Sequence, residues 1–94
     1  MKEAIEKILN NFVLGDIKIS YYDINIYPTP ELKTSLYDAE IFAPLNIPMV
    51  DAETILERLK TCFTMLGFQS VSGNLFHDAD RDKLLIRVTG TMRI

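Results

Sequence analysis

The sequence predicts an α+β fold, a two-layer sandwich in which two helices cover one face of a mainly antiparallel four-stranded sheet. Two segments repeat apolar residues at the three-and-four spacing of a helix face. Other segments alternate apolar and polar residues as half-buried strands do, and short connections separate them. The expected order is helix, strand, strand, helix, strand, strand, within a single domain of residues 1–94.

An amphipathic first helix is expected near the N-terminus, and Gly15 is the residue expected to end it. Polar residues fill one face of this helix, and the apolar stripe on the other consists of Ile5, Ile8, Leu9, Phe12 and Val13. Charged residues at positions 2, 3, 6 and 7 interrupt any apolar stretch, so we expect mature sequence rather than a signal peptide.

The first strand is predicted from Ile17, where apolar residues begin to recur at every second position. This alternation slips by one residue between Tyr21 and Tyr22. Either a β-bulge lies at this point, or the strand passes from one packing environment to another. Prolines at positions 28 and 30 are expected to end the strand, because proline cannot donate a hydrogen bond to a neighbouring strand.

The second strand is predicted from Leu36 to Ala43, with Phe42 on its polar face. The connection that follows, residues 45–50, is unusually apolar for a loop. Two interpretations are open. The connection either folds back as a lid on the core, or it is exposed and marks a protein contact.

Asp51 is expected to cap the N-terminus of the second helix, and Gly67 is expected to end it. The predicted core stripe of this helix consists of Ala52, Ile55, Leu56, Leu59, Cys62, Phe63 and Leu66. Because Cys62 lies on that stripe, we expect a small buried side chain rather than a nucleophile.

A weak strand over 68–75, a polar turn over 77–82 and a long last strand complete the predicted sheet. The apolar face of the last strand consists of Leu84, Ile86, Val88, Met92 and Ile94. Gly90 interrupts this apolar row and is expected to mark a bend. We expect the last strand to lie at an edge of the sheet, where its backbone groups would be open to a neighbouring subunit.

Composition excludes several classes of protein. The formal net charge is −3, which gives no electrostatic reason to expect a nucleic acid or an anionic membrane as partner. The longest uncharged run, residues 61–76, contains polar residues and glycines and is too polar to span a bilayer. The single cysteine excludes an internal disulfide framework.

The most metal-like feature of the sequence is the acidic run His77, Asp78, Asp80 and Asp82. An EF-hand calcium loop starting at Asp78 would need glycine at its sixth position and glutamate at its twelfth, where Lys83 and Thr89 stand. Motifs for phosphate loops, zinc proteases and serine hydrolases are absent from the sequence. We therefore expect no metal, cofactor or small-molecule substrate, and no enzymatic activity.

The side chains expected to contact other proteins fall in the tyrosine-bearing first hairpin, the apolar connection and the polar face of the last strand. The tyrosines have mainly acidic neighbours, which favours a protein contact over stacking on nucleic-acid bases. The candidate interface residues are Tyr21, Tyr22, Phe42, Leu45, Ile47, Met49, Val50, Arg87 and Arg93.

Three segments carry a resemblance to a known family: the strand 36–44 (LYDAEIFAP), the helix start 51–59 (DAETILERL) and the strand 82–94 (DKLLIRVTGTMRI). Their order resembles that of the tail terminator proteins of phages and phage-like particles, in which a strand ending in proline leads to a helix and a long last strand. The resemblance covers residues 33–94. It implies a non-enzymatic protein that forms a ring on the tail tube, stops its polymerisation and joins it to the neck.

We therefore expect a structural assembly protein of a phage tail or phage-like contractile particle, either a ring-forming tail terminator or another tail or neck completion protein. Its expected partners are further copies of itself and other tail or neck proteins. Its expected location is the virion or particle, assembled in the bacterial cytoplasm. The alternative is a small phage- or bacterium-encoded binding module that inhibits a host protein complex.

Overall fold

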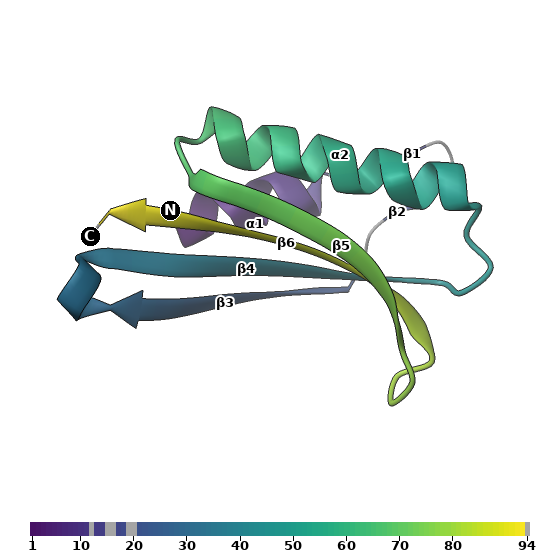
Figure 1. Cartoon of the computed structure of the whole chain (residues 1–94). Coiled ribbons are helices and arrows are strands. Elements are labelled where there is room, and N and C mark those ends of the chain that lie inside the picture. Colours follow the sequence, from purple (N-terminus) through teal and green to yellow (C-terminus); the bar gives the residue numbers. More distant parts are fainter. Residues whose placement is uncertain (12, 15–16, 19–20, 94) are drawn as a thin grey trace.

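The computed structural model describes residues 1–11, 13–14, 17–18 and 21–93 of the chain. Helices α1 (Lys2–Asn10) and α2 (Met49–Met65) lie on one face of a four-stranded antiparallel sheet, which confirms the predicted α+β class (Figure 1). The strands of this sheet are β3 (Tyr22–Thr29), β4 (Thr34–Ala43), β5 (Gln69–Asp78) and β6 (Lys83–Arg93). Neither of these helices has the length and apolar character needed to cross a membrane.

The segment predicted as the first strand contributes to two different sheets. Its first part, β2 (Ile17–Lys18), pairs with β1 (Val13–Leu14), whereas β3 pairs with β4. No bulge lies at the slip, because Tyr21 bonds to Phe42 and Tyr22 pairs with Ile41 in continuous register, and the strand before the slip pairs in another sheet. Helix α1 ends at Asn10, so the predicted helix is too long at its C-terminal end, and Val13 lies in β1 instead. Phe12 and Gly15, the residue predicted to end the helix, lie outside the described residues.

The order of strands in the sheet is β3-β4-β6-β5, with every neighbouring pair antiparallel. The expectation that the last strand lies at an edge is wrong, because β6 pairs with β4 on one side and with β5 on the other. Alternation along a strand reports which face is exposed, and it carries no information on neighbours. The free edges of the sheet are β3 and β5.

Strand β3 continues through Pro28 to Thr29, one residue beyond the first of the two prolines expected to end it. The Phe42 amide donates to the Tyr21 carbonyl at 3.2 Å, so every second residue from Tyr21 onward bonds to β4. Pro28 is one of the alternate residues between them, whose backbone groups point away from β4. An edge strand therefore tolerates this proline, and only Pro30 begins the turn Pro30–Leu32.

Helix α2 begins at Met49, so Asp51 is not its cap. The carbonyl of Pro48 accepts hydrogen bonds from the amides of Asp51 (3.0 Å) and Ala52 (3.1 Å), which makes Pro48 the capping residue. The Asp51 carboxylate lies in the first turn instead, where the helix dipole favours a negative charge. The predicted stop is confirmed in position: Gly67 follows the helix with φ of 96°, a left-handed conformation that glycine adopts readily.

The core lies between the two helices and the sheet. Its fully buried large side chains are Ile5, Leu9, Ile41, Ile55, Leu59, Phe63, Ile86 and Val88. Gly90 lies opposite Tyr37 in continuous pairing between β4 and β6. A Cβ on Gly90 would lie only 3.1 Å from Cδ2 of Phe63 and 3.0 Å from Cβ of Phe68, so this glycine allows α2 to approach the sheet closely.

Candidate interaction surface

The face of the sheet opposite the helices, called the open face below, is not covered by any helix that the structure describes (Figure 1). Strand pairing arranges its side chains in rows that run across β3, β4, β6 and β5. The first row is Tyr21, Phe42, Leu85 and Phe76, with Tyr21 placed by its bond to Phe42. The second row is Asp23, Glu40, Arg87 and Asn74. The third row is Asn25, Asp38, Thr89 and Ser72.

The first row is apolar, and its two central side chains are shielded from solvent. Phe42 is 7% exposed and Leu85 is 6% exposed, whereas Tyr21 (48%) and Phe76 (38%) at the ends of the row are open to solvent. The rings of Tyr21 and Phe42 have centroids 4.8 Å apart. The guanidinium of Arg81 lies 4.8 Å from the Phe42 ring centroid and shields that ring from above.

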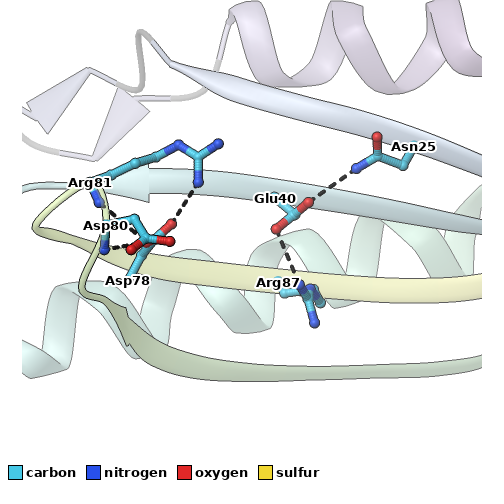
Figure 2. A network of polar contacts seen from close by, with 6 residues as sticks. All are labelled: Asn25, Glu40, Asp78, Asp80, Arg81 and Arg87. Atoms are coloured by element: carbon cyan, nitrogen blue, oxygen red, sulfur yellow. Dashed lines mark hydrogen bonds and ion pairs between the residues drawn. The ribbon is translucent and has the colours of Figure 1, made fainter.

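The turn between β5 and β6 places Arg81 over the open face. One oxygen of Asp78 accepts hydrogen bonds from the amides of Asp80 (3.1 Å) and Arg81 (3.3 Å), and the other accepts one from the Arg81 guanidinium (2.9 Å) (Figure 2). The hydrogen bond from Arg81 lowers the pKa of the Asp78 carboxyl. The acidic residue singled out in the sequence thus shapes a turn. Among the described residues, no group of three or more potential ligands is placed to hold a metal ion.

A polar network occupies the middle of the open face (Figure 2). Asn25 donates to Glu40 at 3.0 Å, and Arg87 donates to the other oxygen of Glu40 at 3.2 Å, so the network joins β3, β4 and β6. Nε of Arg87 also lies 3.5 Å from Oδ1 of Asp38, and both atoms are buried without a hydrogen-bond partner. Asp38 and Arg87 therefore attract each other through charge, without a hydrogen bond between these atoms.

Burial raises the pKa of Asp38, the Glu40 carboxylate raises it further, and the charge of Arg87 lowers it in part. At a pH between the ordinary pKa of 3.8 and the raised pKa, the Asp38 carboxyl is deprotonated in the unfolded chain but still protonated in the folded chain. The folded state then binds more protons, so the free energy of unfolding contributed by Asp38 falls as pH rises through this window.

We expect the substitution Asp38→Asn to remove that fall, as measured by urea unfolding at a series of pH values. Asp78→Asn serves as the control of opposite sign. Because the pKa of Asp78 is lowered, its contribution to stability is lost as pH falls through the window below 3.8. If Asp38→Asn left the pH dependence of wild-type stability unchanged, the assignment of Asp38 as the destabilised carboxylate would be refuted.

A second exposed surface lies at the start of α2. Leu45 (46% exposed), Met49 (56%) and Val50 (68%) are open to solvent, whereas Ile47 (8%) is buried in the core. Ile47 therefore closes the core as the lid interpretation predicts, whereas its neighbours face outward, and their contact with another protein stays a prediction. Val50 also lines a shallow groove of about 580 Å³ along α2. Cys62, expected to be buried, is only half-buried and lines the same groove.

The predicted interface residues separate into three groups. Tyr21, Phe42, Arg87 and Arg93 lie on the open face or at its end, and Leu45, Met49 and Val50 lie at the start of α2. Ile47 and Tyr22 belong to the helix side of the sheet, where Tyr22 packs against the core and its hydroxyl donates to Asn10 at 2.9 Å. Sequence reasoning missed Asn25, Asp38 and Glu40, although their positions alternate with apolar residues in strands already predicted. It also missed Phe76, which lies one residue beyond the predicted strand 68–75.

Comparison of the chain with models of protein families, with curated proteins and with solved structures finds no match.

Proposed function

We propose that this chain is a non-enzymatic structural assembly protein that acts through contacts with other proteins. The observation that carries this proposal is that three apolar side chains within six residues at the start of α2, Leu45, Met49 and Val50, are exposed. Exposed apolar side chains that lie near one another are typical of protein contact sites, because their burial in a complex removes apolar surface from water, which is favourable in free energy. Methionine is enriched at such contacts and adapts to the shape of a partner.

The more specific form of the proposal is a ring-forming tail terminator, or another tail or neck completion protein, of a phage or phage-like contractile particle. The resemblance over residues 33–94 supports it. A ring needs two different patches on each subunit, so that the contact repeats head to tail. The start of α2 supplies one patch, and neighbouring copies and tail or neck proteins are the proposed partners. The proposed location is the virion or particle, after assembly in the bacterial cytoplasm.

The double variant Met49→Ser/Val50→Ser tests this assignment. We expect the wild-type chain, mixed with purified tail tube, to form rings visible by negative-stain electron microscopy and native mass spectrometry. The double variant should lose them, because two exposed apolar side chains become polar while the fold keeps its core. Met65→Ser is the matched control, since Met65 is 82% exposed on the same helix but lies at the opposite end.

Equal loss of rings in Met65→Ser and in the double variant would contradict a specific contact at the start of α2. A wild-type chain that forms no ring with tail tube would contradict the terminator assignment. In that case, stoichiometric capture of one host protein complex would favour the inhibitor class of function.

A further inference from the structure

The open face has a division of charge that makes it complementary to itself. The carboxylates Asp23, Asp38 and Glu40 lie on β3 and β4, and the guanidinium groups of Arg87 and Arg93 lie on β6. Apart from the Asp78–Arg81 ion pair of the β5–β6 turn, the carboxylates of the face therefore lie on its β3–β4 half and the guanidinium groups on its β6 half. Exposed aromatic rings stand at both ends of its apolar row, Tyr21 beside β3 and Phe76 on β5.

We infer that the open face binds the open face of a second copy of this chain, around a two-fold axis that runs along the strands between β4 and β6. Half a turn about such an axis brings β4 over β6 of the second copy and β3 over β5. Every row then lies opposite the same row of the second copy. The twist of the two sheets would offset their strands by about 30°, as in other aligned sheet packings.

This arrangement brings complementary side chains together in the first two rows. In the first row, Tyr21 of one copy faces Phe76 of the other, and the Arg81 guanidinium over Phe42 lies between the two copies beside these exposed rings. In the second row, Glu40 faces Arg87 of the other copy, so acidic side chains meet basic ones. A two-fold axis perpendicular to the strands would instead place the apolar first row over the polar far end of the sheet, which ends with Thr34 opposite Arg93.

The size of the face is sufficient for a weak dimer. Four strands spaced about 4.8 Å apart, each about ten residues long at about 3.3 Å per residue, cover roughly 600 Å² per copy. Two copies would bury about 1,200 Å², which is at the lower end of specific protein interfaces. We therefore expect a reversible dimer with a dissociation constant in the micromolar range.

This inference is independent of the proposed function, because a two-fold contact closes on itself and does not build a ring. Sedimentation equilibrium of the purified chain tests it without any tail component. A wild-type chain that stays monomeric into the millimolar range would overturn it, whatever the outcome with tail tube.

Position 74 tests the orientation of the two copies. The axis places Asn74 opposite Asp23 of the second copy, and both residues are exposed on the separate chain. Asn74→Lys should tighten the dimer about 3- to 10-fold, and Asn74→Asp should weaken it by a similar factor, because two symmetric pairs form or repel. Thr64→Lys and Thr64→Asp make the same changes of charge at an exposed position of α2 and should leave the dissociation constant unchanged.

Cross-linking gives a readout that net charge does not affect. In a Cys62→Ser background, chains carrying Asp23→Cys are mixed with chains carrying Asn74→Cys and treated with a short bis-maleimide. The mixture should give a cross-linked dimer, whereas either chain alone should give little, because the two copies of one position lie about three strand spacings apart, roughly 14 Å sideways. Equal yields from the mixture and from either chain alone would overturn the proposed axis.

Discussion

Phe63→Ala is expected to lower the free energy of unfolding by about 3–5 kcal/mol, which is a large part of the roughly 5–15 kcal/mol typical of small domains. The Phe63 ring is 1% exposed and stacks on Phe68, with centroids 4.7 Å apart. Phe68 in turn meets the edge of Tyr37 at 5.0 Å, so the aromatic group links α2 to the sheet. Urea unfolding followed by circular dichroism measures the loss.

Phe76→Ala is the matched control, because it makes the same chemical change on the open face at a ring that is 38% exposed. We expect it to cost about 1 kcal/mol or less. Equal losses for the two variants would contradict the assignment of the core to the helix side of the sheet.

Gly90→Ala probes the same contact from the other side. Alone it should cost about 1–3 kcal/mol, since its new Cβ would lie 3.1 Å from the Phe63 ring and force a shift. In the Phe63→Ala background that ring is gone, and the cost of Gly90→Ala should fall by about 0.5 kcal/mol or more. Strict additivity of the two changes would show that Phe63 and Gly90 are not coupled.

Arg87→Met is expected to lower the free energy of unfolding by about 1–3 kcal/mol, because it leaves two carboxylates on adjacent positions of one face without a counter-charge. Within the described residues, Arg87 is the one base within 4.0 Å of Asp38 or Glu40. The Arg87 side chain is 38% exposed, so water screens part of the effect and a larger loss is not expected. Urea unfolding at pH 7 measures it.

Arg93→Met provides the control, because Arg93 is exposed at the end of the same strand and on the same face. It should change stability by no more than about 0.5 kcal/mol. Adding Asp38→Asn to Arg87→Met should recover part of the loss, since it removes one of the two carboxylates. A failure of this rescue would mean that Arg87 stabilises the fold by packing over Phe76, whose ring centroid lies 5.1 Å from its guanidinium, rather than by its charge.

The elements that local periodicity determines could be predicted. The stripe of α2 holds four buried residues at the expected positions, Ala52, Ile55, Leu59 and Phe63, because burial on a helix repeats every three or four residues. The alternation of β4 and β6 likewise separates the core face from the open face. Cys62 departed from the expectation because it lies at the margin of the α2 stripe, where a periodic pattern does not decide exposure.

Strand order and the open-face network could not be predicted in the same way. The pairing of β4 with β6 joins residues far apart in sequence, and no local pattern reports it. Without that pairing, nothing places Arg87 beside Asp38 and Glu40, or Phe76 in a row with Phe42. Arg87 and Phe42 were singled out because of the face of the strand on which they lie, whereas the partners that give them a chemical context depend on register.

The central position of the β4–β6 pairing also bears on how the chain folds. The hairpins β3–β4 and β5–β6 each close over short connections, but the hydrogen bond from Arg87 to Glu40 spans 47 residues and the whole of α2. Such long-range pairing carries a larger entropic cost of loop closure than either hairpin. We therefore expect the pairing of β4 with β6, which must bring the two hairpins together across α2, to be the step that sets the folding rate.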